Sequence, residues 1–204
     1  MRKKLFGFIF ILFSISGFGQ SSKTLNYFAN PLIADSLSSI VIPVQYDVNL
    51  LNSSKLSYGE YYANIIFYDF VKDSSKRLFN NDTFIKGFDS YYNYNKKYSL
   101  DNMSSKWIFY FVKSFDYSKN GKIDSDDPYF LYVSDKNGNG LKSITPTNEN
   151  AVSINIYDKQ GFALIKMQRD FDKDNDFESD DKDYYYIRLD LNTLILGNKI
   201  EIKE

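Results

Sequence analysis

Two acidic stretches carry the clearest chemical pattern in the chain. The first covers residues 116–127 and the second residues 170–181, and each begins and ends with an Asp. Oxygen-bearing side chains recur at alternate places in both stretches. This spacing lets one loop direct several oxygens toward a common centre, which is the environment that a hard cation prefers. The pattern therefore predicts two cation sites.

Both stretches are typical of a calcium loop of the EF-hand type, which offers ligands from places one, three, five, seven, nine and twelve. The sixth place, where the chain must turn sharply, holds Gly121 in the first loop and Asn175 in the second. The eighth place is apolar in both, as Ile123 and Phe177. The predicted ligands of the first loop are Asp116, Ser118, Asn120, the backbone carbonyl of Lys122, Asp124 and Asp127. Those of the second loop are Asp170, Asp172, Asp174, the backbone carbonyl of Asp176, Glu178 and Asp181.

Two departures from the motif predict weak binding. The twelfth residue is Asp and not the longer Glu, and Ser118 offers a neutral oxygen where Asp or Asn is usual. We expect an affinity on the order of 10⁻⁴ to 10⁻³ M for the first loop and a higher affinity for the more acidic second loop. The alternative is a pair of solvated acidic turns that bind no ion, because Asp, Asn and Gly also favour plain turns. Residues 135–140 alternate oxygen groups too, but they lack a terminal acid and predict a hairpin turn.

The first residues are typical of a secretory signal. Arg2, Lys3 and Lys4 precede a mostly apolar stretch, and small residues predict cleavage after Gly19. The apolar stretch is shorter than the ~20 residues that span a bilayer, so we expect no membrane span after cleavage. Residues 20–204 then form one domain. The expected location is outside the cytoplasm, either periplasmic or extracellular.

The composition excludes several function classes. The chain has no His and no Cys, which removes the common catalytic triads and zinc sites. Its 25 basic and 26 acidic residues give a net charge of −1, whereas nucleic-acid binding needs a basic surface. No catalytic or organic-cofactor residues stand out, so we expect a non-enzymatic protein with a protein or glycan partner. The alternative is a carbohydrate-binding module or a glycoside hydrolase that uses carboxylates.

The rest of the sequence predicts an all-β fold. Aromatic residues make up 18% of the chain, and they favour strands together with Val and Ile. Alternating segments and short turns predict three units of four antiparallel strands, at about 30–82, 83–147 and 148–203. Predicted strands include residues 40–47, 64–70, 107–113, 129–134, 162–167 and 184–189, with further strands near 32–39 and within 88–98. Both acidic loops join the second and third strands of a unit.

Two segments carry a resemblance to a known family. Residues 131–146 resemble the third-to-fourth strand hairpin of a TolB-type, WD-like β-propeller repeat, and residues 153–164 resemble the strand–turn–strand that opens such a repeat. The Ser-Pro-Asp-Gly turn of the family is degenerate here, because residues 157–161 lack the Pro. The resemblance implies a propeller-blade fold and a binding platform in the cell envelope. Closed propellers have four to eight blades, so three units predict an incomplete or unusually small propeller.

Overall fold

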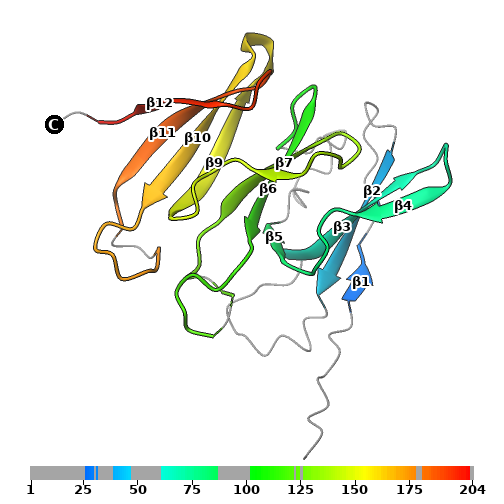
Figure 1. Cartoon of the computed structure of the whole chain (residues 1–204), viewed down its shortest axis with the longest axis horizontal. Helices are drawn as coiled ribbons and strands as arrows, with labels where there is room; N and C mark the ends of the chain where they lie inside the picture. Colours follow the sequence, from blue (N-terminus) through cyan, green and yellow to red (C-terminus); the bar gives the residue numbers. More distant parts are fainter. Residues whose placement is uncertain are drawn as a thin grey trace, which may run out of the picture.

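The computed structural model describes residues 26–29, 31, 39–46, 61–86, 102–121, 123–124, 126–177 and 181–202. These residues form an eight-stranded sheet, sheet A, and a four-stranded sheet, sheet B, and all of their strand pairs are antiparallel. The prediction of an all-β fold with antiparallel sheets is therefore confirmed. Figure 1 shows sheet B at one flank of the molecule, with sheet A on one side of it. The part of the chain described contains no helix of the length and apolar character that crossing a membrane requires.

Sheet A consists of two sets of strands that each pair in chain order. The first set is β1 (Asn26–Phe28), β2 (Ser39–Tyr46), β3 (Tyr61–Asp69) and β4 (Ser74–Arg77), and the second is β5 (Phe84–Lys86), β6 (Trp107–Lys113), β7 (Phe130–Asp135) and β8 (Lys142–Ser143). Two residue pairs, Tyr61 with Lys86 and Tyr62 with Ile85, connect β3 to β5. This short ladder joins both sets into one sheet.

Sheet B is a meander of four strands, each paired with the next one along the chain. It contains β9 (Glu149–Tyr157), β10 (Phe162–Arg169), β11 (Tyr184–Asp190) and β12 (Leu196–Ile200). The short 3₁₀ turn η1 (Asp158–Gln160) connects β9 to β10, and Gly161 follows it at a φ of 72°. Glycine adopts this left-handed backbone conformation without a steric penalty, which allows the chain to reverse direction here.

Strand β6 is the common wall of two hydrophobic cores. Its sequence is a continuous apolar run, as expected for a strand that is buried on both faces. Ile108, Tyr110 and Val112 point into a core formed with β2, β3 and β5. Phe109 and Phe111 point the other way, into the core beneath sheet B. Because side chains alternate along a strand, β6 packs against residues of β2, β3 and β5 on one face and against sheet B on the other.

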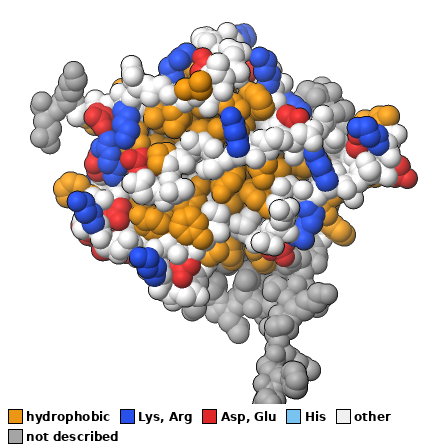
Figure 2. Space-filling model, viewed as in Figure 1, with side chains coloured by type: hydrophobic (Ala, Val, Ile, Leu, Met, Phe, Trp, Pro, Cys, Tyr) orange, Lys and Arg blue, Asp and Glu red, His pale blue; other side chains and the backbone are white. Residues whose placement is uncertain are grey.

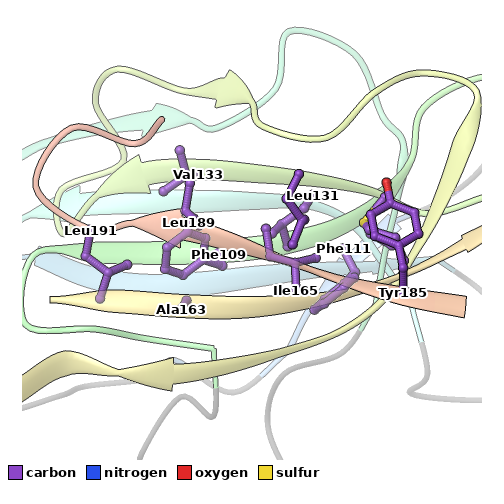
Figure 3. Packing of buried hydrophobic residues seen from close by; sticks show 12 residues of the cluster. Phe109, Phe111, Leu131, Val133, Ala163, Ile165, Tyr185, Leu189 and Leu191 are labelled. Carbon is purple, nitrogen blue, oxygen red and sulfur yellow. The ribbon is translucent and has the colours of Figure 1, made fainter. Parts of the chain in front are cut away.

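The second core fixes sheet B onto β6 and β7. Figure 3 shows side chains from both sheets pointing toward one another, among them Leu131 and Val133 from β7 and Ile165 and Leu189 from sheet B. These four residues are all at most 1% exposed. Burying side chains of this size contributes about 1.5–3 kcal/mol each relative to leaving them in water. This packing fixes β6, β7, β10 and β11, the four strands that the acidic loops connect.

The turn at residues 135–140 is confirmed as the hairpin turn between β7 and β8. Asp135 Oδ1 accepts hydrogen bonds from the backbone N–H groups of Asn137 and Asn139, at 2.8 and 2.7 Å. The turn also contacts β2, because the Ser39 hydroxyl donates to Asn137 Oδ1 at 3.0 Å. Gly138 has a φ of 71°, and any Cβ there would lie 2.5 Å from the Phe67 ring. Glycine is therefore required for this close approach.

The structure agrees with part of the predicted arrangement of units. The third unit forms sheet B as a separate four-stranded meander, whereas the first and second are joined by the β3–β5 pairing. The strand β5 at Phe84–Lys86 was not predicted. The strand β1 at Asn26–Phe28 was also not predicted, and it pairs with Val44–Tyr46 of β2. The signal segment at 1–19 and the predicted strand within 88–98 lie outside the described residues, as does most of 32–39.

Candidate metal centres

The two acidic loops occupy equivalent places in the fold and lie beside each other. The first connects β6 to β7 and the second connects β10 to β11, as the sequence predicted. The rings of Tyr117 in the first loop and Phe177 in the second are in contact, with 5.6 Å between their centroids. In Figure 1 both loops lie along the lower edge of the molecule. The two loops therefore contact each other through these rings.

The same two hydrogen bonds shape both loops. The carboxylate at the first place accepts from the backbone N–H at the sixth place, from Gly121 to Asp116 at 2.9 Å and from Asn175 to Asp170 at 3.2 Å. The carboxylate at the last place accepts from the N–H at the second place. Those bonds run from Tyr117 to Asp127 at 2.7 Å and from Phe171 to Asp181 at 2.5 Å.

The backbone dihedral angles also match between the loops. The fourth place has a positive φ in both, 59° at Lys119 and 65° at Lys173. The sixth place has a positive φ too, 87° at Gly121 and 71° at Asn175. Asn is one of the few side chains that adopt this conformation at low cost, which explains how it replaces glycine. The two loops thus share a positive φ at both of these places.

The second loop gathers carboxylates. One oxygen each from Asp170, Asp172 and Asp174 lie within 4.8 Å of one another. Loss of water around its carboxylate, followed by the nearby charges of Asp174 and Asp181, raises the pKa of Asp172 above its usual value. Oxygens that bind one Ca²⁺ at about 2.3–2.6 Å are at most about 5 Å apart. The spacing of this cluster therefore fits a shared calcium ion.

The first loop is held mainly by its own hydrogen bonds. Asp127 is 2% exposed, and its carboxylate accepts from three backbone N–H groups, those of Tyr117, Ser118 and Asp124. The buried Lys113, at the end of β6, donates from its ammonium group to the backbone carbonyl of Asp124. This ammonium group also lies 4.8 Å from the centre of the Tyr129 ring. A fixed positive charge therefore borders the first loop.

A buried amide supports the end of the second loop. Gln168 is 4% exposed and donates from Nε2 to the backbone carbonyl of Asp181 at 2.9 Å. Its Oε1 accepts from Asn150 Nδ2 at 2.7 Å, and Asn150 Oδ1 in turn accepts from the Tyr129 N–H at 2.8 Å. This chain of bonds runs from the second loop to the start of β7. It ties the loop to the neighbouring sheet.

The predicted ligands are brought together to different extents. Asp170, Asp172 and Asp174 form the cluster, while Asp181 is buried and held by the Phe171 N–H. In the first loop the Ser118 hydroxyl lies 3.4 Å from Asp116 Oδ1. The remaining described ligands are Asn120 and Asp176, each near the middle of its loop, and the buried Asp124 and Asp127. Lys122 and Glu178 lie outside the described residues.

Three residues that contact or connect these loops were not identified from the sequence. Lys113 and Gln168 reach the backbone carbonyls of Asp124 and Asp181, and Tyr117 connects the loops through Phe177. Each lies within a few residues of a predicted ligand, but the sequence does not show which of these neighbouring side chains are buried or in contact with the loops.

Comparisons with protein-family models, curated proteins and solved structures gave no match to this chain. The function must therefore be inferred from the geometry alone.

Proposed function

We propose that this protein is a calcium-stabilised binding or scaffold protein and not an enzyme. The observation that carries the proposal is the set of matching hydrogen bonds and positive φ angles in the two acidic loops. Plain acidic turns would have no reason to repeat these bonds and angles with Gly at the sixth place of one loop and Asn at that of the other. The repeated spacing of oxygen groups supports calcium as the ion, since it takes six to eight oxygen ligands.

The ion would act on stability. In the second loop it would replace repulsion among Asp170, Asp172 and Asp174 by shared ligation. Binding to the folded state alone stabilises it by mass action, by about 1.4 kcal/mol when calcium is tenfold above its Kd. Because the loops join neighbouring strands and contact each other through Tyr117 and Phe177, this energy would hold sheet B against β6 and β7.

The propeller-blade interpretation belongs to the same proposal. Support comes from the pairing, since β1–β4, β5–β8 and β9–β12 are each meanders of four strands in chain order. The blade-like units would form a compact array related to TolB-type propeller repeats. The basic and apolar residues at 1–19 support export to the periplasm or the exterior, where weak calcium sites are filled.

Thermal unfolding with and without calcium tests the proposal. The melting temperature of the protein without residues 1–19 should rise by about 3–6 °C when millimolar calcium replaces a chelator. The double variant Asp170→Ala, Asp181→Ala should lose most of that rise. Asp82→Ala serves as the matched control, because it removes an exposed carboxylate that contacts Arg77 far along the chain from both loops. A parent protein whose melting curve ignores calcium would end the proposal.

A further inference from the structure

Sheet B covers the second core with one face and turns the other face outward. Apolar surface is common on folded proteins, so exposed apolar side chains alone do not mark a binding face. Figure 2 shows apolar side chains along the middle of the molecule, between the flank formed by sheet B and the opposite side, so the outward face of sheet B is defined by its own residues. The burial of β11 alternates strictly, with Tyr185, Ile187 and Leu189 inside. The outward positions of β10 and β11 are Phe162, Leu164, Lys166, Tyr184, Tyr186, Arg188 and Asp190, whereas Gln168 is buried.

The outward face is aromatic where a solvated sheet face is normally polar. Tyr184 and Tyr186 are 38% and 37% exposed, and Tyr157 at the end of β9 is 41% exposed. The ring of Tyr157 stacks on that of Phe162, with centroids 5.0 Å apart. Large exposed aromatic side chains of this kind are enriched in binding surfaces.

The aromatic side chains follow the direction of β11. Tyr184 and Tyr186 are two residues apart, or about 7 Å along a strand. Phe162 pairs with Asp190, four residues beyond Tyr186, and so lies about 14 Å further along. The rings therefore stand in a row about 20 Å long, which suits an extended ligand with a repeated flat face more than a small compact one.

Positive charge accompanies the rings. The Lys166 ammonium lies 4.3 Å from the centre of the Tyr184 ring, and the Arg188 guanidinium lies 5.2 Å from that of Phe162. Among the outward positions of β10 and β11, the single carboxylate is that of Asp190. It accepts from the N–H groups of Asn192 and Thr193 and lies 3.9 Å from Arg188. Lys166 and Arg188 together carry two positive charges, and Asp190 carries the one negative charge that offsets them. The outward positions of β10 and β11 therefore have an excess of positive charge.

We propose that the outward face of sheet B binds an anionic polysaccharide, with tyrosine rings against the flat faces of the sugars and Lys166 and Arg188 against the acidic groups. A second copy of the chain is disfavoured, because a symmetric dimer through this face would bring its cations together. The proposal goes beyond the calcium-dependent role and does not depend on cations at the acidic loops.

Calorimetric titration of the protein with a sodium polyuronate tests this proposal. A neutral glucan of similar length is the comparison ligand, and chelator is present throughout, so failure of the calcium proposal cannot affect the result. We expect binding of the polyuronate that weakens as salt is added, and weak or absent binding of the glucan. Arg188→Glu and Tyr186→Ala should each raise the Kd by about tenfold or more.

Matched variants elsewhere on the surface provide the controls. Lys142→Glu reverses an exposed charge on β8, and Phe70→Ala removes an aromatic ring that is 54% exposed beyond β3. Both should leave the Kd within about twofold, and all four variants should keep the parent melting temperature to within about 4 °C. The proposal is overturned by no binding of the polyuronate, by equal binding of the glucan, or by tighter binding of a single-stranded oligonucleotide. It is also overturned if Tyr186→Ala abolishes a dimer or leaves polyuronate binding unchanged.

Discussion

The two acidic loops share two hydrogen bonds and two positive φ angles, but they differ in the groups that surround them. In the first loop, Asp127 accepts from three backbone N–H groups and the Lys113 ammonium bonds to a loop carbonyl. In the second, three carboxylates crowd within 4.8 Å of one another, and the terminal Asp181 accepts from the Phe171 N–H. The comparison teaches that the same bonds and φ angles occur in a loop beside a buried lysine and in a loop that crowds its carboxylates. The second loop is therefore the one in which calcium should matter most.

The largest expected difference concerns the last carboxylate of each loop. Without calcium, Asp127→Ala should reduce the free energy of unfolding by about 3 kcal/mol, because one buried and two partly buried N–H groups lose their acceptor. Asp181→Ala should cost about 1 kcal/mol, because its carboxylate accepts one such bond among the described residues, from Phe171. Urea denaturation in chelator measures both values, and Asp127→Asn should recover part of the loss. Equal losses would mean that the first loop has no special internal support.

Lys113 offers a way to convert the first loop into one like the second. Lys113→Met should cost about 1–3 kcal/mol, because the buried Asp124 carbonyl loses its donor. The same change removes a positive charge beside the predicted first site, so calcium should bind there more tightly. Lys106→Met, which removes an exposed ammonium that contacts Asn192, is the control. Calorimetry would contradict the prediction if the calcium affinity of the first loop fell or stayed constant.

The sixth place tests whether the shared positive φ angle is needed. Gly121→Ala should reduce the free energy of unfolding by about 1–2 kcal/mol, because a φ of 87° is unfavourable for any residue with a Cβ atom. No atom lies within 4 Å of that Cβ, so the cost would come from the backbone and not from a clash. Asn175→Gly should change stability by less than about 0.5 kcal/mol. A harmless Gly121→Ala would show that this loop tolerates another path.

The smallest effect is a difference in pH dependence. The pKa of Asp172 is raised in the folded protein, so its contribution is fully present below the usual carboxyl pKa and is lost as pH rises through the raised value. Asp135 has the opposite behaviour. Although burial opposes it, hydrogen bonds from Asn139 lower the pKa of Asp135, and its contribution is lost as pH falls.

Melting curves in chelator at about pH 4 and pH 7 check these signs. Relative to the parent, Asp172→Asn should gain melting temperature at the higher pH, where the parent suffers repulsion among its carboxylates. Asp135→Asn should lose melting temperature at the higher pH, where its carboxylate is charged and hydrogen-bonded. If the melting temperatures of both variants changed in the same direction between the two pH values, the causes assigned to the two pKa shifts would be contradicted.

The sequence predicted well those features that depend on local patterns. The strand at 107–113 matches β6 to the residue because a continuous apolar run marks a strand buried on both faces. The position of both acidic loops between the central strands of a meander followed from their alignment. The β3–β5 pairing could not be predicted, because it consists of two residue pairs and depends on where the two sets of strands in sheet A meet. Lys113 was missed for a similar reason, since only the fold shows that a lysine at a strand end is buried.

Calorimetric titration of the metal-free protein with calcium is the most direct test of the central claim. We predict two saturable binding events, with the tighter one in the second loop and a Kd no weaker than about 10⁻³ M for either. Asp172→Asn should remove the tighter event and leave the weaker one in place. A titration without saturable heat, or a tighter event that survives Asp172→Asn unchanged, would contradict the proposal that these loops bind calcium.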